Sequence, residues 1–313
     1  MKRLTTLLLL LTMLLAACSG HNDPADTETS TETETEVQTE AESALKSVED
    51  MTEIEGVTAV TKLDQYCTNT ELAYRVDFEV DGIGRYFEIA LPADYAQKDY
   101  PCVLYFPDVG TEANFIVENF AQKDIIVMRM YQRGNRGNEG VNDFCGKDFA
   151  DAQVLFAICK ACPFLSRGGI FSAGAATGSI FALRLAAEYP DEINGCIVID
   201  TIGDIEAFAE YRGENMRNML LYMFDCSEQE LSAECSKRSP KHFYKTIKAP
   251  VLMFCYTENP LLPASQAEEL KSLLDANGCN AELEHLSPLS SDFNGTAFMK
   301  LIPWIKDIAG NTK

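Results

Sequence analysis

Few side chains in this sequence combine the types and the spacing that catalysis needs. Histidine, the usual proton carrier near neutral pH, occurs only three times, as His21, His242 and His285. No histidines and cysteines are spaced as in a zinc site. A phosphate-binding loop and a Gly-x-Gly-x-x-Gly motif after a strand are also missing from the sequence. The sequence therefore predicts no metal ion and no cofactor, and it leaves little base chemistry for any mechanism.

Cys159 and Cys162 have the Cys-x-x-Cys spacing of a redox pair. The reactive thiolate of such a pair is stabilised at the start of a helix, whereas these cysteines end a predicted helix over 148–162. The helix dipole disfavours a thiolate at that end, so a redox role is the weaker interpretation. Free cysteine also packs well as a small hydrophobe. Three further cysteines stand within apolar runs typical of strands: Cys102, Cys196 and Cys255.

Residues 1–17 have the layout of a removable signal peptide. A positive start at Lys2 and Arg3 is followed by an apolar run over 7–15 and then by small residues. The letters LAAC, ending at Cys18, resemble the lipobox of bacterial lipoproteins. The resemblance implies cleavage before Cys18 and acyl chains on that residue, and two or more chains anchor a protein stably to a membrane. An ordinary secretory signal with a chance cysteine is the alternative.

Residues 18–43 predict a disordered acidic tether. Between positions 22 and 42 there are eight acidic and no basic residues, and such a segment buries too little apolar surface to fold. We expect a spacer that holds a domain off a membrane of the bacterial cell envelope, with a binding segment for a partner as the alternative. The whole chain has 26 basic and 48 acidic residues, a net charge of −22. This balance argues against nucleic acid as a partner and against electrostatic adhesion to anionic lipid.

The rest of the chain, residues 44–313, alternates strand-like and helix-like segments. Strands are expected over 74–80, 85–91, 101–106, 124–130, 169–172, 195–200, 251–256 and 281–286, and helices over 112–122, 148–162, 179–189, 264–277 and 297–308. Such alternation predicts a mostly parallel sheet with helices on both faces. The segment 205–247 interrupts it with polar, helical sequence and predicts a lid over the strand ends.

Four stretches, in this order, resemble the prolyl oligopeptidase branch of the α/β-hydrolase fold. They are RGNRGNEG over 133–140, NDFCGKD over 142–148, GIFSAGAATGSIFALRLA over 169–186, and RSPKHFYKTIKAPVLMFCYTENPLLPASQA over 238–267. The resemblance covers about Gly82 to Ile308. It implies an α/β-hydrolase fold for residues 44–313 and cleavage of an amide or ester bond by a Ser-His-Asp triad. A fold does not establish a function, so each catalytic position has to be examined.

The nucleophile of this family lies in a Gly-x-Ser-x-Gly turn between a strand and a helix, where small residues are needed on both sides. The corresponding stretch here is GAATG over 174–178, so Ala176 stands at the nucleophile position. A methyl group cannot attack a carbonyl. Thr177 is the fallback nucleophile, but its own flanking residues are not glycines. A Thr177 hydroxyl bonded to the backbone of the turn is the stronger interpretation.

The resemblance also identifies the positions of the acid and the base. Asn259 stands where the family has its catalytic acid, and an amide there cannot stabilise an imidazolium. Ser291 stands where the family has its histidine, and no histidine follows His285 in the chain. His285 itself falls within the expected strand 281–286, so we expect a sheet residue rather than a base.

Pro107, Asp108 and Val109 occupy the loop that supplies the oxyanion hole in the family, where glycines let backbone N–H groups face the substrate. Proline has no N–H, and the Asp108 carboxylate would repel a developing negative charge. The nucleophile, acid, base and oxyanion positions are thus all substituted. Each substitution removes a part of triad catalysis.

Three functions remain open from the sequence. The leading hypothesis is a membrane-anchored, non-catalytic protein that binds a small molecule or a peptide in the old catalytic cleft. The second is an active peptidase or esterase that works through non-standard residues. The third is a structural cell-envelope protein with a vestigial cleft. An open pocket around Ala176 would favour binding over a purely structural role.

Overall fold

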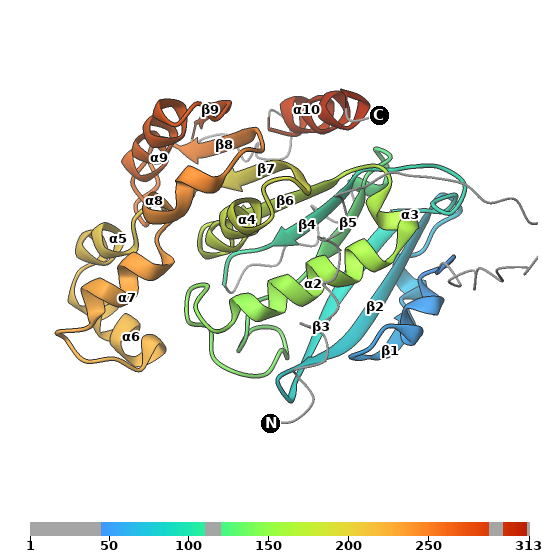
Figure 1. The fold of residues 1–313 in the computed structure, drawn as a ribbon, viewed down its shortest axis with the longest axis horizontal. Helices are drawn as coiled ribbons and strands as arrows, with labels where there is room; N and C mark the ends of the chain where they lie inside the picture. The colour runs from blue at the N-terminus through green and yellow to red at the C-terminus, as the bar shows by residue number, and fades with distance from the viewer. Residues whose placement is uncertain (1–44, 110–119, 288–296, 312–313) are drawn as a thin grey trace, which may run out of the picture. The chain divides into compact units, whose positions relative to one another are not determined.

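The computed structural model describes residues 45–109, 120–287 and 297–311, all within one compact unit, Ser43–Lys313. Its centre is a nine-stranded sheet in the order β1-β2-β3-β5-β4-β6-β7-β8-β9 (Figure 1). The first three strands and β5 pair antiparallel, and all pairs from β5 to β9 are parallel. The strands are β1 (Val57–Lys62), β2 (Glu71–Val80), β3 (Ile83–Pro92), β4 (Cys102–Phe106), β5 (Ile126–Arg129), β6 (Ile170–Ala175), β7 (Ile193–Ile199), β8 (Val251–Tyr256) and β9 (Ala281–Leu286).

Helices cover both faces of this sheet. The larger hydrophobic core lies between one face and α2, α4 and α9, whereas the smaller core packs α10 against the other face. The helices outside the lid are α2 (Phe149–Ala161), α3 (Pro163–Ser166), α4 (Thr177–Glu188), α9 (Ser265–Ala276) and α10 (Phe298–Asn311). Because both faces are covered, β4 and β5 are buried at every residue, as is typical of parallel strands. The predicted mostly parallel sheet with helices on both faces is confirmed.

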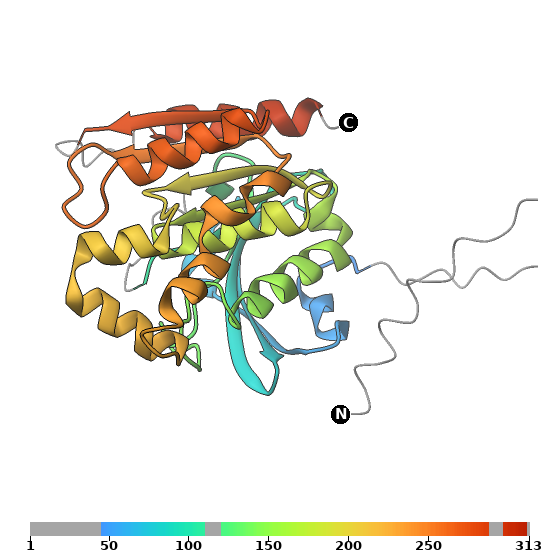
Figure 2. The same cartoon turned by 60° about the vertical axis from the view of Figure 1, so that its left-hand side comes forward.

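The predicted lid is helical and leaves the sheet between β7 and β8. It contains α5 (Ile205–Arg212), α6 (Glu214–Phe224), α7 (Leu231–Arg238) and α8 (Pro240–Phe243). Asp204 caps the start of α5, because its carboxylate accepts hydrogen bonds from the N–H groups of Glu206 and Ala207. The yellow-to-orange helices of the lid lie at the end of the sheet toward which the parallel strands point (Figures 1 and 2). Within the described ranges, no helix is long and apolar enough to cross a membrane.

Several element boundaries differ from those expected. The edge strand β1 was not predicted at all, and most of the predicted helix 112–122 lies outside the described residues. The strand expected over 169–172 continues to Ala175, and the helix expected from position 179 begins two residues earlier, at Thr177. Strand and helix thus meet almost directly at Ala176, with no loop between them.

Candidate functional site

Ala176 forms the sharp turn between β6 and α4. Its backbone has φ 43° and ψ −112°, a conformation that is strained for any residue with a Cβ atom. The turn is close-packed: a Cβ atom on Gly174 would lie 2.2 Å from the Gly178 carbonyl oxygen, and one on Gly178 would lie 2.0 Å from the Phe106 carbonyl oxygen. The two glycines and the strained residue between them are the features that a nucleophile elbow requires. The turn has this geometry although the side chain at its apex is a methyl group.

A cavity of about 420 Å³ opens above Ala176, at the carboxyl ends of the parallel strands. Ligands of open α/β sheets bind at this edge. Much of the polar lining follows β4, β6, β7 and β8, with Asn142 and Arg212 in addition, and much of the apolar lining comes from the lid. The lining includes Asp108, Thr177, Asp200 and Asn259 on the polar side and Phe208, Met216, Met219, Met223, Leu261 and Leu262 on the apolar side.

Thr177 is held by a carboxylate. Its hydroxyl donates to Asp108 Oδ1 at 2.8 Å, and its backbone N–H donates to the same oxygen at 3.3 Å. The buried Gln132 side chain completes the contact, because Nε2 donates to the Thr177 hydroxyl at 3.3 Å and to the Pro107 carbonyl at 2.9 Å. The expectation that the Thr177 hydroxyl bonds to the turn backbone was wrong. In elbow enzymes the N–H after the nucleophile stabilises the oxyanion, and here that N–H faces Asp108.

Asn259 lines the same cavity and is paired with Asp200, a residue that was not predicted. Asn259 Nδ2 donates to Asp200 Oδ2 at 3.0 Å, and the Tyr256 N–H donates to Asp200 Oδ1 at 2.9 Å. Burial raises the pKa of Asp200, the hydrogen bonds from Tyr256 and Asn259 oppose this shift, and the charge of Asp108 adds to it. The sequence did offer one signal for Asp200. It is the last residue of the expected strand 195–200, and ligands bind at the carboxyl ends of such strands.

The remaining predicted site residues are placed as follows. Val109 lines the cavity, and Pro107 is buried beside it. Ser291 and Cys18 lie outside the described residues. Neither histidine of the described part lines the cavity: His242 belongs to α8, and His285 belongs to β9, where Nε2 lies 3.0 Å from Glu268 Oε1. The described residues contain no group of three or more side chains suited to hold a metal ion.

Solved structures with the same architecture include enzymes. One is an acylaminoacyl peptidase bound to a chloromethyl ketone, with a TM-score of 0.64 and 15% identity over 75% of this chain and 42% of its own. Another is the acetyl xylan esterase of Paenibacillus sp. R4, with a TM-score of 0.65 and 13% identity over 81% of this chain and 90% of its own. This protein has the α/β-hydrolase fold. The expected fold class is therefore confirmed.

A relative in sequence is the uncharacterized peptidase YtmA of Bacillus subtilis (strain 168). It is 27% identical over 169 residues, which are 53% of this chain and 65% of the relative. The match thus spans less than two thirds of that relative, as it does of the acylaminoacyl peptidase. No family model matches the chain. The chain thus resembles an uncharacterized peptidase in part of its sequence, and it shares its fold with solved peptidases and esterases.

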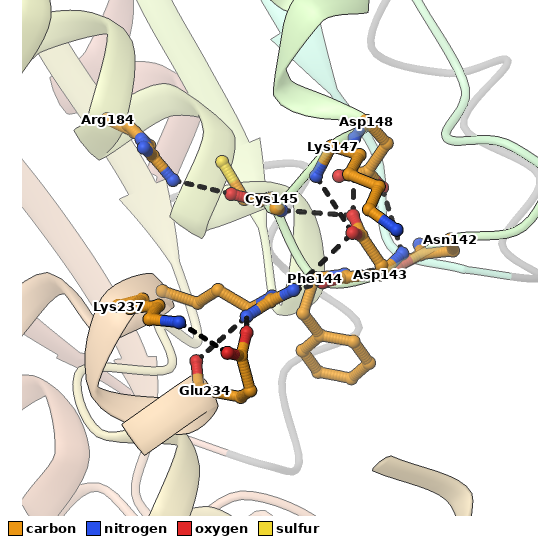
Figure 3. Close-up of polar contacts among 11 residues, drawn as sticks. Asn142, Asp143, Phe144, Cys145, Lys147, Asp148, Arg184, Glu234 and Lys237 are labelled. Carbon is orange, nitrogen blue, oxygen red and sulfur yellow. Dashed lines mark hydrogen bonds and ion pairs between the residues drawn. The ribbon is translucent and has the colours of Figure 1, made fainter. Parts of the chain in front are cut away.

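The loop Asn142–Asp148 joins this hydrolase core to the lid. Three backbone N–H groups, those of Gly146, Lys147 and Asp148, donate to the Asp143 carboxylate (Figure 3). Arg238 of the lid donates from Nε to the Asp143 carbonyl oxygen at 2.8 Å, and its Nη2 lies 3.5 Å from the Asp143 carboxylate. Phe144 packs edge-on against Phe224 of α6 and also lines the cavity. The loop therefore fixes the lid above the cleft.

Two buried carboxyl groups, those of Asp143 and Asp148, lie close together within this loop. Burial raises the pKa of Asp148 well above its ordinary value, and the neighbouring Asp143 raises it further. Burial also opposes ionisation of Asp143, but hydrogen bonds from the Asp148 side chain and from the Lys147 and Asp148 N–H groups outweigh it and lower the pKa. The pair therefore favours the proton on Asp148 and the negative charge on Asp143, the carboxylate that faces Arg238.

The cysteines of the described part are all free thiols. Cys159 Sγ lies 3.7 Å from Cys102 Sγ in the core, and burial raises the pKa of Cys162 to about 12. Contact with Cys102 and burial together raise the pKa of Cys159 well above its ordinary value. Neither residue of the Cys-x-x-Cys motif is thus a thiolate at neutral pH, which argues further against a redox role.

Proposed function

We propose that this chain is a lipoprotein of prolyl oligopeptidase type that binds a small molecule or a peptide in its cleft and has lost triad catalysis. The open cavity above Ala176 carries the proposal. A cleft that had become purely structural would be expected to fill with side chains, because protein interiors pack densely. The third hypothesis, a structural envelope protein, is therefore the weakest.

The loss of catalysis is supported by what surrounds Ala176. The elbow presents a methyl group, and Asn259, which stands at the acid position by resemblance, brings an amide to the same cavity. The N–H of Thr177 faces the Asp108 carboxylate, so a substrate oxyanion would meet a negative charge there.

The alternative is an active peptidase or esterase with Thr177 as its nucleophile. The observation in its favour is the 2.8 Å hydrogen bond from the Thr177 hydroxyl to Asp108 within the cavity. A carboxylate is a weak base for a hydroxyl, because general-base catalysis is most efficient with a pKa near the working pH. Binding without turnover is therefore the better-supported function.

Hydrolysis of p-nitrophenyl acetate and labelling by a fluorophosphonate separate the two functions. We expect the wild-type chain to hydrolyse the ester at background rate and to resist labelling. Ala176→Ser alone should add little, because triad members act as a unit. Ala176→Ser with Asn259→Asp and Ser291→His should give weak turnover, and glycines at 107–109 should increase it, since one oxyanion donor is worth about 10²–10³ in rate. Robust wild-type turnover that is lost in Thr177→Ala would establish the alternative.

The proposed membrane anchor is lipidated Cys18, at the end of the LAAC stretch. With two or more acyl chains the protein should partition into the detergent phase of a phase-separation assay. Cys18→Ala should move it to the aqueous phase. Unchanged partitioning of that variant would contradict the lipoprotein assignment and would leave the proposed cleft function untouched.

A further inference from the structure

The cavity floor carries two carboxylates from neighbouring parts of the sheet edge. Asp108 follows β4 and Asp200 follows β7, and both line the cavity on either side of the Ala176 turn. Each holds a fixed orientation, because Asp108 accepts from Thr177 and Asp200 accepts from Tyr256 and Asn259. The charge of Asp108 also contributes to the raised pKa of Asp200, so the two carboxylates repel one another electrostatically. Two like charges facing one cavity favour a cationic ligand between them.

The opposite wall is apolar and adaptable. Met216, Met219 and Met223 lie three and four residues apart, on one face of α6, and all three line the cavity beside Phe208. Methionine side chains are flexible and polarizable and fit ligands of varied shape. Arg212 also lines the cavity, but its guanidinium lies over the Phe208 ring, 5.8 Å from the ring centre, and reaches toward the Leu261 carbonyl oxygen. The cationic group of Arg212 is therefore engaged by the Phe208 ring and the Leu261 carbonyl oxygen.

We propose that the cavity selects primary amines with an apolar body, the ammonium group lying between Asp108 and Asp200 and the apolar part against the methionines of α6. This inference rests on the proposed binding function and names its ligand class. An ammonium group supplies three hydrogen-bond donors and no acceptor, which matches two carboxylates that offer only acceptors. The same floor disfavours the carboxylate of an acidic ligand and the oxyanion of a hydrolytic transition state. The pair of charges thus favours a cationic ligand and adds to the absence of a nucleophile at Ala176 as an obstacle to hydrolysis.

Titration calorimetry of the full chain with three probes of equal length tests the inference. The probes are n-hexylammonium, 1-hexanol and n-hexanoate, at pH 7.5. We expect hexylammonium to bind about tenfold more tightly than hexanol, because hydrogen bonds between a charged donor and a charged acceptor are stronger than those of a neutral hydroxyl. We expect hexanoate to bind most weakly of the three.

Variants locate the preference. Asp108→Asn and Asp200→Asn should each reduce the advantage of hexylammonium about tenfold and leave hexanol binding unchanged. The double variant Asp200→Asn with Asn259→Asp exchanges the amide and the carboxylate of this hydrogen-bonded pair. It should restore the preference for hexylammonium. The matched control is Asp191→Asn, which removes an exposed carboxylate paired with Lys248 and should change nothing.

Met219→Trp fills the cavity from the lid. It distinguishes failure of the amine inference from failure of the proposed binding function. If hexanol binds and Met219→Trp weakens it, but the wild type does not prefer hexylammonium, the amine inference is overturned and the binding function stands. If no probe binds, or if Met219→Trp leaves all binding unchanged, both are overturned. A preference that survives both Asp108→Asn and Asp200→Asn would also overturn the inference.

Discussion

Two turns border the cleft and both force residues with side chains into left-handed backbone. The elbow contains Ala176 at φ 43°, and the loop Asn142–Asp148 contains Phe144 at φ 55° and Cys145 at φ 66°. In the loop, buried hydrogen bonds and the Arg238 contact account for the strain. In a nucleophile elbow the strained backbone exposes the nucleophilic side chain. In this protein the residue at that position, Ala176, has only a methyl group. The comparison teaches that close packing is enough to hold the geometry of a nucleophile elbow, since no reactive side chain stands at Ala176.

Arg238→Ala should produce the largest loss of stability. It removes the cation that faces the buried Asp143 carboxylate, the hydrogen bond to the Asp143 carbonyl oxygen, and the guanidinium that lies 4.2 Å from the Phe224 ring centre. Breaking a buried ion pair from one side costs about 3–5 kcal/mol. Urea unfolding at pH 7.5 measures the change, and the midpoint should fall sharply.

The control for this variant is Arg217→Ala, on the same lid. Arg217 pairs with Glu228 at the surface, and exposed pairs contribute little. If Arg238→Ala proved as mild as Arg217→Ala, the loop would not be what fixes the lid.

Gly178→Ala tests the other side of the comparison, the packing of the elbow. Its Cβ atom would meet the carbonyl oxygens of Phe106 and Pro107 at 2.0 and 2.9 Å, and backbone cannot move aside easily. Overpacking of this kind costs about 1–3 kcal/mol. Gly310→Ala is the matched control, because a Cβ atom on that helical glycine has no neighbour within 4 Å. Thermal unfolding should show Gly178→Ala destabilised and Gly310→Ala unchanged or slightly stabilised.

Much of the fold could be predicted because its buried strands are local apolar runs. β4 and β8 were expected nearly at their observed ends, since every residue of β4 and most of β8 are buried. β1, Val57–Lys62, was missed because it lies at the sheet edge, has no buried residue, and shows no regular alternation of apolar and polar residues. An edge strand leaves only a weak pattern in sequence.

The site was predictable only where a motif marks it. Ala176, Asn259 and Asp108 follow from their motifs, and all three line the cavity. The hydrogen bonds between site residues could not be predicted, because the partners are remote in sequence. Thr177 bonds to a carboxylate 69 residues away, and Asn259 bonds to one 59 residues away. Local patterns carry no information on such contacts.

Asp148→Asn should reveal the buried acid of the loop through pH. An unfolded aspartate has a pKa near 3.9, and the folded pKa of Asp148 is raised well above that by burial and Asp143. Between these values the folded chain binds one more proton than the unfolded chain, so its stability falls as pH rises, by about 1.4 kcal/mol for each pH unit. The amide keeps an acceptor for the Asp143 N–H and needs no proton.

We therefore expect Asp148→Asn to match the wild type near pH 3.5 and to exceed it increasingly from pH 4.5 upward. Urea unfolding of both proteins at several pH values gives the difference directly. A constant difference across this range would mean that Asp148 is ionised in the folded chain, and the account of the two shared carboxylates would be wrong.

Ala176→Gly should have the smallest effect and is the sharpest test of the comparison. A residue with a Cβ atom at φ 43° and ψ −112° stores about 1–3 kcal/mol of strain, which glycine does not. Glycine also makes the unfolded chain more flexible, which offsets about 0.5–1 kcal/mol of that gain. We expect a net stabilisation of about 1 kcal/mol, measured by thermal unfolding.

Gly137→Ala, at φ 84° in an open loop, is the inverse control and should destabilise by a similar amount. If Ala176→Gly were destabilising, the methyl group would be contributing contacts in the cleft, and the elbow would be an adapted wall of the binding site, not a relic of catalysis.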